Sequence, residues 1–366
     1  FQPFLQEKHR GDTYRVQGET MDMRIDDRLR AALAAALLLI LMTGCGAEPK
    51  ASPDTQEACL QIGMLFDNFV MERWERDRDV FVSAARELGA EVNVQNANGS
   101  VEEQVKLMEY FIQKKVDAIV IVPIDSAPLL ETVKKAQSSN IKVIAYDRLI
   151  VGANPDLYIT FDNRKVGELM AQTLVNDTET TTDLLMICGP LTDHNVLEVE
   201  EGFLSEIRGK DVSVLDTYYT DGWKPENAGA YIREHRELAE SVSGIMCGND
   251  NLAGAVVDAL AEQRLAGKVR AVGQDGDLAA CQRIVEGTQS KPVDKLASRA
   301  AQETVRLIHG ETLECEYYLT EDGDQIPYIR LAPVAVTQDN MQSVIIDSGF
   351  HLREDVYLNR PDLMKP

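Results

Sequence analysis

The stretch "SVEEQVKLMEYFIQKKVDAIVIV", residues 100–122, predicts a helix followed directly by a strand. Ser100 and Glu103 have the spacing of a capping box, which marks the start of a helix. Apolar residues then recur every three or four positions, as on the buried face of an amphipathic helix: Val101, Val105, Met108 and Ile112. "DAIVIV" is short and rich in β-branched residues, which is typical of a strand.

The same alternation of strand and helix continues on both sides of this stretch. Nine β-rich runs follow one another: "LQIGMLF", "AEVNVQNA", "DAIVIV", "KVIAYD", "LYITF", "DLLMIC", "VSVLDTYY", "SGIMC" and "VRAVG". Helical patterns separate them, and this order predicts parallel sheets with helices on both faces. Nine strands exceed what one domain usually holds, so we expect an α/β protein with two doubly wound parallel-sheet lobes.

Composition and charge limit the possible partners. The chain has 366 residues, of which 44% are hydrophobic and 27% charged, so it can bury two cores. Its net charge of −23 argues against nucleic acid or an anionic membrane face as a partner. The six cysteines show neither CxxC spacing nor histidine partners, so we expect no metal and no cofactor. Cys188 and Cys247 end apolar runs and are predicted to be buried thiols.

Residues 21–45 have the pattern of a bacterial export signal. Arginines precede an apolar run from Ala31 to Met42, which is too short to cross a bilayer core of about 30 Å as a helix. The run is followed by Thr43-Gly44-Cys45, which looks like a lipobox and predicts lipidation of Cys45. A simple secretory signal and an uncleaved membrane anchor remain alternatives.

The segments beside this signal have different characters. Residues 1–20 do not begin with Met and are interpreted as upstream translation, with Met21 or Met23 as the start. Residues 46–59 are polar, contain proline and show no apolar period, so we expect a flexible tether.

Polar side chains follow almost every predicted strand. In open parallel sheets, ligands bind just beyond the carboxyl ends of the strands. The residues at these ends are Asp67, Asn68, Asp147, Arg148, Asp162, Asn163, Asp193, His194, Asn195, Asp221, Trp223, Asn249, Asp250, Gln274 and Asp275. Asp67, Asp162 and Asp250 could equally be N-caps of the helices that follow. Capping does not explain Arg148 or Trp223.

This set of side chains suits a neutral sugar. Each sugar hydroxyl both donates and accepts hydrogen bonds, so carboxylates, amides and guanidinium groups can all pair with it. The apolar faces of a pyranose stack on indole rings. Trp74 and Trp223 are the only tryptophans in the chain, and we expect them on opposite sides of the sugar.

The sequence favours binding without catalysis. It contains no GxSxG, no HExxH and no P-loop. "EDGD" at 321–324 lacks the ligand spacing of an EF-hand and predicts a turn. Paired carboxylates leave a glycosidase possible by residue type, but we expect no enzyme.

Several ordered motifs carry a family resemblance that covers about residues 60 to 352. They are "ERWERDRDVF", "VQNANG", "AYDR", "ITFDNRKVGEL", "DGWKPENA", "GNDNLAGA", "GKVRAVGQDGDL" and "GFH". Together they resemble bacterial periplasmic sugar-binding proteins with the ribose-binding type of fold. The resemblance implies the type I periplasmic binding protein fold, in which two lobes joined by a three-strand hinge close on a sugar.

The resemblance also implies lobe boundaries and sugar contacts. The first lobe would hold 60–162 plus 296–328 and the second 163–295 plus 329–350, with 351–366 as a C-terminal tail. The implied sugar contacts are Arg73, Trp74, Asp147, Arg148, Asp193, Asn195, Trp223, Asn249, Asp275 and Lys295. His194 stands where the family has Asn, and the surroundings of Lys295, "SKPVDKLA", depart from the family pattern.

The family implies a monomeric, extracytoplasmic receptor, which Cys45 would anchor to the membrane through lipid. It would capture D-xylose or a related aldopentose and deliver it to an ABC permease. A co-receptor that signals to a membrane sensor kinase is the alternative. A DNA-binding regulator of the same fold is disfavoured, because an export signal stands in place of a helix-turn-helix. The choice between pentose and hexose depends on the space near one ring carbon.

Overall fold

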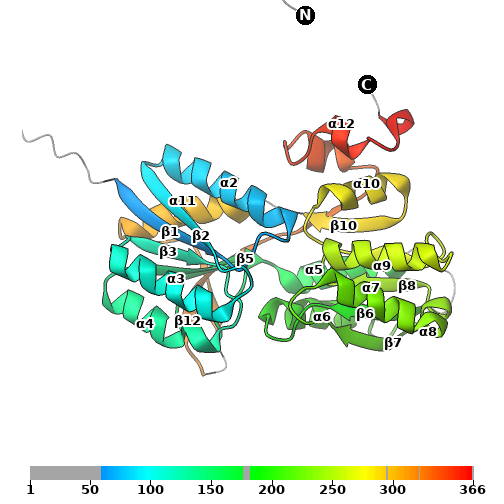
Figure 1. Ribbon diagram of the computed structural model, residues 1–366, viewed down its shortest axis with the longest axis horizontal. Coiled ribbons are helices and arrows are strands. Elements are labelled where there is room, and N and C mark those ends of the chain that lie inside the picture. Colours follow the sequence, from blue (N-terminus) through cyan, green and yellow to red (C-terminus); the bar gives the residue numbers. More distant parts are fainter. Residues whose placement is uncertain (1–58, 176–181, 294–295, 321, 365–366) are drawn as a thin grey trace, which may run out of the picture. The chain divides into compact units, whose positions relative to one another are not determined.

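The computed structural model describes residues 59–175, 182–293, 296–320 and 322–364. These residues form two α/β lobes, each built on one sheet (Figure 1). The predicted two-lobe α/β fold is therefore confirmed. The predicted export signal with Cys45, nearly all of the predicted tether, and Lys295 lie outside the described residues. Among the helices that the structure describes, none has the length and apolarity that crossing a bilayer requires.

The first lobe contains a seven-stranded sheet in the order β11-β12-β5-β4-β3-β1-β2. All neighbouring strands are parallel except β11, which pairs antiparallel with β12. The strands are β1 (Leu60–Phe66), β2 (Ala90–Asn96), β3 (Ala118–Ile121), β4 (Lys142–Tyr146), β5 (Leu157–Phe161), β11 (Glu316–Leu319) and β12 (Gln325–Leu331). Residues 322–324 of the predicted turn lie between β11 and β12, where the Gly323 N–H donates to the Thr320 carbonyl at 3.0 Å, and residue 321 lies outside the described residues.

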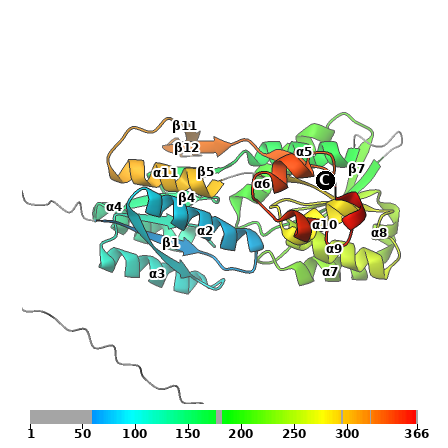
Figure 2. The same cartoon turned by 90° about the horizontal axis from the view of Figure 1, so that it is seen from above.

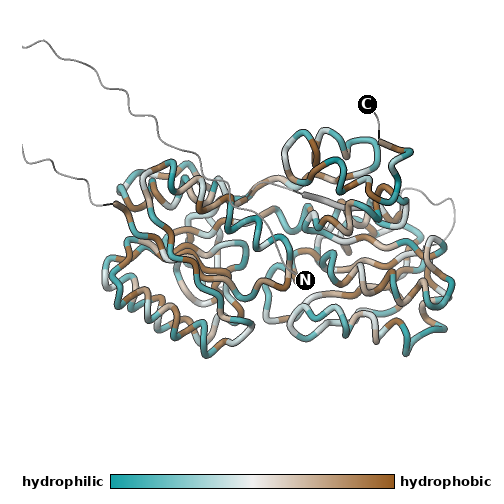
Figure 3. The backbone as a smooth tube through the Cα atoms, turned by 45° about the horizontal axis from the view of Figure 1, so that its top comes forward, coloured by the Kyte–Doolittle hydropathy of each residue, from teal (hydrophilic) through white to brown (hydrophobic). Residues whose placement is uncertain are grey.

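Helices cover both faces of this sheet (Figure 2). One face packs against α2 and α11, and the other packs against α3 and α4. The helices are α2 (Glu72–Glu87), α3 (Val101–Lys114), α4 (Leu130–Ser138) and α11 (Leu296–Ile308). The predicted cap of α3 is present, since Ser100 accepts a hydrogen bond from the Glu103 N–H at 3.2 Å. Brown, hydrophobic segments follow the central strands of this lobe in Figure 3, because strands covered on both faces are apolar on both sides.

The second lobe contains a six-stranded sheet in the order β13-β10-β9-β8-β6-β7. Only β13 runs antiparallel to its neighbour, β10. The strands are β6 (Thr182–Cys188), β7 (Val212–Tyr219), β8 (Gly244–Cys247), β9 (Arg270–Val272), β10 (Gln289–Val293) and β13 (Val334–Val336). The helices are α5 (Asn163–Val175), α6 (His194–Ile207), α7 (Pro225–Glu234), α8 (Arg236–Ser241), α9 (Asp250–Glu262) and α10 (Leu278–Glu286).

The nine predicted strands correspond to β1–β9, and β10–β13 were not predicted. "QSKPV" and "QIPYIRL" each contain a proline, which argues against a strand when only the sequence is known. β11 lies at a sheet edge and is largely exposed, so it has no apolar run to reveal it. In β10 and β12, pairing with neighbouring strands outweighs the unfavourable proline.

The chain passes between the two sheets after β5, after β10 and after β12. Strand β12 continues in the first sheet until Leu331 pairs with Phe161, three residues beyond the predicted lobe boundary after residue 328. The predicted C-terminal tail is packed over its described part. It contains α12 (Arg353–Val356), which lies near α10 in Figure 1. Buried Val356 and Tyr357 belong to one apolar cluster with residues of α10.

Candidate ligand-binding site

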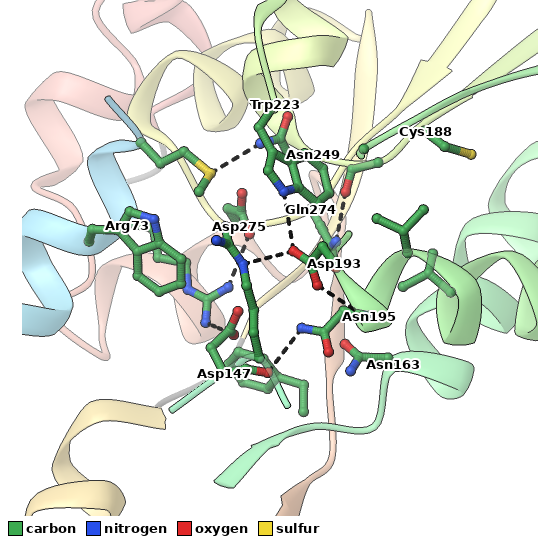
Figure 4. A pocket seen from close by; sticks show the side chains of 18 of the residues that line it. Arg73, Asp147, Asn163, Cys188, Asp193, Asn195, Trp223, Asn249, Gln274 and Asp275 are labelled. Carbon is green, nitrogen blue, oxygen red and sulfur yellow. Dashed lines mark hydrogen bonds and ion pairs between the residues drawn. The ribbon is translucent and has the colours of Figure 1, made fainter. Parts of the chain in front are cut away.

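Loops at the carboxyl ends of strands in both lobes line one cavity (Figure 4). The cavity has about 540 Å³ of empty space, part of it open to solvent. The structure brings nine of the ten predicted sugar contacts to its walls: Arg73, Trp74, Asp147, Arg148, Asp193, Asn195, Trp223, Asn249 and Asp275. As contacts to a sugar they stay predictions.

Arg73 connects the two lobes from the first turn of α2. Its guanidinium donates a hydrogen bond to Asp147, and its Nη1 lies 3.3 Å from Asp275 Oδ1 in the second lobe (Figure 4). Its Nε lies 3.5 Å from Asp77 Oδ2. Burial alone would lower the pKa of Arg73, but the three carboxylates outweigh burial and raise it well above its usual value. Arg73 is therefore a permanent cation in the cavity wall.

Arg148 makes a second connection between the lobes. Its Nη1 donates to Asp67 Oδ2 at 2.9 Å, and its Nε lies 2.7 Å from Asp193 Oδ2. The contact with Asp193 is electrostatic, because the buried Nε–H forms no hydrogen bond. Burial lowers the pKa of Arg148, but Asp67 and Asp193 raise it further than burial lowers it. Asp67 thus pairs with a site arginine.

Asp193 both caps a helix and lines the cavity. As N-cap of α6 it accepts a hydrogen bond from the Asn195 N–H at 3.1 Å. It also accepts from the Trp223 indole at 3.2 Å between Nε1 and Oδ2. Burial raises the pKa of Asp193, and the nearby Arg148 guanidinium only partly opposes this effect. Capping and a place in the site are therefore compatible for one carboxylate.

Asn195 ties the first turn of α6 to the first lobe. Its Nδ2 donates to the backbone carbonyl of Asp147 at 3.0 Å. Its Oδ1 accepts from the Tyr158 hydroxyl at 3.2 Å. Both the nitrogen and the oxygen of the Asn195 amide therefore form hydrogen bonds to the first lobe.

Trp223 lies against two glycines that sequence reasoning missed. A Cβ on Gly189 would lie 2.4 Å from Trp223 Cη2, and one on Gly248 would lie 3.0 Å from Cζ3. Both glycines follow a strand that ends in Cys, in "ICGP" and "MCGN". This repeated strand-Cys-Gly pattern is the signal that could have identified them. The indole packs against this flat glycine surface because neither position has a side chain.

Trp74 belongs to the core as much as to the cavity. It is 1% exposed and packs against Phe66 and Tyr146, with ring centroids 6.0 and 6.4 Å apart. The guanidinium carbons of Arg73 and Arg148 lie 4.5 and 5.7 Å from the centre of its ring. Its buried Nε1 forms no hydrogen bond to any described residue. Arginines therefore lie over this indole, whereas Trp223 is only half-buried.

Asn249 and Asp250 have different tasks at the start of α9. Asn249 Oδ1 accepts from the Leu252 N–H at 2.9 Å, so this site residue is also the cap of the helix. The carboxylate of Asp250 accepts from the N–H groups of Gly276 and Asp277, each at 3.2 Å. Asp250 thereby holds the loop that carries Asp275. Asp162 does cap a helix, since it accepts from the Lys165 N–H at 3.0 Å.

Three site residues have positive φ angles: Asp147 at 65°, Trp223 at 59° and Asp275 at 110°. The left-handed region is uncommon for residues other than glycine and costs most for bulky side chains. Such strain often occurs at functional sites, where the surrounding contacts maintain it. No residue type announces this geometry in the sequence.

Other lining residues were not predicted as contacts: Met71, Phe161, Asn163, Cys188, Val196, Val199, Met246 and Gln274. Asn163 and Gln274 were among the polar residues that follow predicted strands. The apolar lining residues have no sequence pattern that distinguishes them from ordinary core residues. Cys188 is a buried thiol, as predicted, and burial raises its pKa to about 12. Within the described ranges no cluster of His, Cys, Asp and Glu has the arrangement of a metal site.

The comparisons agree with this geometry. A model of the periplasmic binding protein domain matches residues 62–311, and the chain belongs to that family. Members of the family are solute receptors rather than enzymes, and the fold is the type I periplasmic binding protein fold.

Two curated relatives are D-xylose-binding periplasmic proteins. The one from Haemophilus influenzae is 37% identical over 327 residues, which cover 87% of this chain and 98% of the relative. The one from Escherichia coli is 38% identical over 308 residues, which cover 81% and 92%. A solute-binding protein from Chloroflexus aurantiacus, solved with D-glucose, has a TM-score of 0.74 at 24% identity and covers 81% of this chain and 98% of its own. This structure supports the fold alone.

Proposed function

We propose that the chain is an extracytoplasmic receptor that binds D-xylose between its lobes and delivers it to an ABC transporter. The observation that carries the proposal is one cavity in which the two arginines meet carboxylates from both lobes beside a half-buried tryptophan. The D-xylose-binding periplasmic relatives support the choice of sugar.

The cavity has the chemistry that a pentose requires. Arg73 and Arg148 offer planar guanidinium groups with several N–H donors. Asp147, Asp193 and Asp275 offer acceptors, so a sugar hydroxyl can find a partner both when it accepts and when it donates a hydrogen bond. The Trp223 ring offers an apolar plate for one sugar face. The permanent charge of both arginines keeps these donors available across the physiological pH range.

Sugar binding would favour the closed arrangement of the lobes. A ligand shifts a conformational equilibrium only by its differential affinity for one state. Contacts from α2 and β4 on one side, and from the loops after β6, β7, β8 and β9 on the other, can be made together only when the lobes meet. Closure is then the signal that a transporter can recognise.

The lobe boundaries, lipidation of Cys45 and a monomeric state belong to the same proposal. Mass spectrometry of the mature N-terminus would test the anchor, because a lipobox predicts a diacylated Cys45. Some structures of this fold carry the description of ABC transporter solute-binding proteins, and this favours a permease over the sensor-kinase alternative.

Calorimetry and tryptophan fluorescence of the full chain would test the function. The titrants are D-xylose, D-ribose, L-arabinose, D-glucose and D-galactose. We expect a saturable response to D-xylose with a dissociation constant near 1 μM, equivalent to about −8 kcal/mol. Emission should change because Trp223 lies at the cavity. A response to a hexose but not to D-xylose would correct the substrate, and no response to any sugar would contradict the proposal.

A further inference from the structure

His351 contacts both lobes next to the predicted sugar site. Its Nε2 is hydrogen-bonded to the backbone carbonyl of Gly276 in the second lobe. Its Nδ1 lies 3.9 Å from Glu72 Oε1 in the first lobe. Gly276 directly follows Asp275, and Glu72 directly precedes Arg73. His351 therefore spans the same gap as the pair of Arg73 and Asp275.

Two further contacts make this region an interlobe clasp, which we define as Glu72, Arg76, Leu278, Phe350 and His351. Glu72 Oε2 accepts a hydrogen bond from the Leu278 N–H, at the start of α10, at 3.0 Å. The guanidinium carbon of Arg76 lies 3.4 Å from the centre of the Phe350 ring. The ring of Phe350 in turn meets the His351 ring edge to face, with centroids 5.1 Å apart. Helix α2 thus contacts both α10 and the C-terminal segment of the second lobe.

The hydrogen bond to Gly276 determines which nitrogen of His351 carries a proton. A carbonyl oxygen can only accept, so Nε2 must be the donor, and the neutral ring then has an unprotonated Nδ1. In that form a lone pair faces the Glu72 carboxylate. Protonation turns Nδ1 into a cationic donor and converts the contact with Glu72 into an ion pair. The closed form therefore gains stability when His351 is charged.

Several charged residues surround His351, and the acidic ones among them favour its protonated form. Helix α2 presents Glu72 and Arg76 to the C-terminal segment. The loop before α10 has Asp275 and Asp277 on either side of Gly276, the partner of His351. The C-terminal segment itself adds a cation two residues after His351 and an acid after that, in "HLRE". Glu72 is the carboxylate nearest to Nδ1, at 3.9 Å.

We propose that His351 and Glu72 are positioning residues whose ion pair keeps Arg73 and Asp275 next to each other in the closed form. Sugar affinity therefore increases as His351 is protonated. The inference rests on the proposed sugar-binding function. An unperturbed histidine titrates near pH 6.5, so the dependence falls between about pH 5.5 and 7.5.

Calorimetric titration of the full chain with D-xylose at pH 5.5 and 7.5 would test this proposal. The variants are His351→Gln, which keeps an amide donor for Gly276 but does not titrate, and Glu72→Gln, which keeps an acceptor for Leu278 without charge. In both variants the ratio of the dissociation constant at pH 7.5 to that at pH 5.5 should fall about two- to five-fold below the wild-type ratio. Other titrating groups, including Asp193 and His194, are common to all the proteins and cancel in this comparison.

The matched controls are Glu75→Gln, on the exposed face of α2, and His309→Gln, an exposed histidine at the end of α11. Both should keep the wild-type ratio. The double variant Glu72→Gln with His351→Gln should show no further change, because the two residues act as one pair. Wild type should also take up protons on binding D-xylose near pH 6.5, and His351→Gln should take up fewer.

The failures of the two proposals are distinguishable. D-xylose binding with equal pH ratios in wild type and His351→Gln would overturn the clasp and leave the proposed function intact. If no sugar binds, small-angle scattering of the sugar-free chain tests the clasp directly. A radius of gyration that is smaller at pH 5.5 than at pH 7.5 in wild type, with a weaker response in both clasp variants, would support it. Equal responses would overturn it.

Discussion

Arg73 and Asp275 are 202 positions apart in the sequence, yet their side chains meet at 3.3 Å between Nη1 and Oδ1. Arg73 belongs to the first lobe and Asp275 to the second, so the pair exists only when the lobes are together. The same guanidinium also binds Asp147 of its own lobe. Under the proposed function, assembly of the site and closure of the lobes are one event, which would couple sugar binding to a change of shape.

Replacing Trp223 should weaken binding without unfolding the protein. We expect Trp223→Ala to lower D-xylose affinity by about 2 kcal/mol, or roughly thirty-fold, because the apolar plate is lost. The residue is half-buried and has a strained positive φ, so the melting temperature of the sugar-free chain should change little. Calorimetry and thermal unfolding measure the two effects separately.

The matched variant is Trp74→Ala, which removes an indole from the core. Since Trp74 is 1% exposed, its loss should lower the free energy of unfolding by about 3–5 kcal/mol. If Trp223→Ala costs as much stability as Trp74→Ala, Trp223 is a core residue and its proposed role in binding is wrong.

Arg148→Lys should also weaken binding. One ammonium cannot hold Asp67 and Asp193 together, whereas the guanidinium reaches the first through Nη1 and the second through Nε. We expect a loss of about tenfold in D-xylose affinity, or roughly 1.4 kcal/mol. Arg78→Lys is the control, because Arg78 pairs with the exposed Asp79 on the surface of α2. Equal affinities of Arg148→Lys and wild type would remove Arg148 from the site.

Gly189→Ala should move the Trp223 ring without touching the sugar itself. The added Cβ would lie 2.4 Å from Cη2, a distance that forces the indole to shift. We expect at least a tenfold loss of affinity, about 1.4 kcal/mol, with a change in tryptophan emission of the sugar-free chain. The control is Gly254→Ala in α9, whose Cβ would have Arg283 as its nearest neighbour at 3.4 Å. Wild-type affinity in Gly189→Ala would show that the position of the indole does not determine binding.

Asp193→Asn should change how stability depends on pH. A carboxyl group whose pKa is raised by folding stabilises the fold below its unfolded pKa, and this contribution is lost as pH rises through the folded value. Asparagine does not titrate, and its single oxygen can replace only one of the two carboxylate oxygens that accept from the Asn195 N–H and from the Trp223 indole. Wild type should therefore lose stability relative to Asp193→Asn as pH rises from about 3.5 toward neutral.

Urea unfolding of both proteins at several pH values measures this difference. The opposite slope would mean that attraction to Arg148, rather than burial, dominates the titration of Asp193.

Local sequence patterns were sufficient for much of the architecture. The runs that became β1–β9 and the capping box at Ser100 follow from periodicity and helix-terminus chemistry, which depend on residues close in the chain. The rule that ligands bind at strand ends then selected Asp147, Asp193 and Asp275 before any geometry was known. These inferences succeed because parallel strands carry their carboxyl ends to one edge.

Tertiary structure decided the rest. Trp74 is covered by core side chains and two guanidinium groups, Trp223 rests on glycines from two strands, and the C-terminal residues pack on α10. The sequence by itself determined which elements form and which side chains stand at their ends. Only the packing of distant segments decided which of these side chains meet, because burial, positive φ angles and contacts between lobes depend on residues that are far apart in the chain.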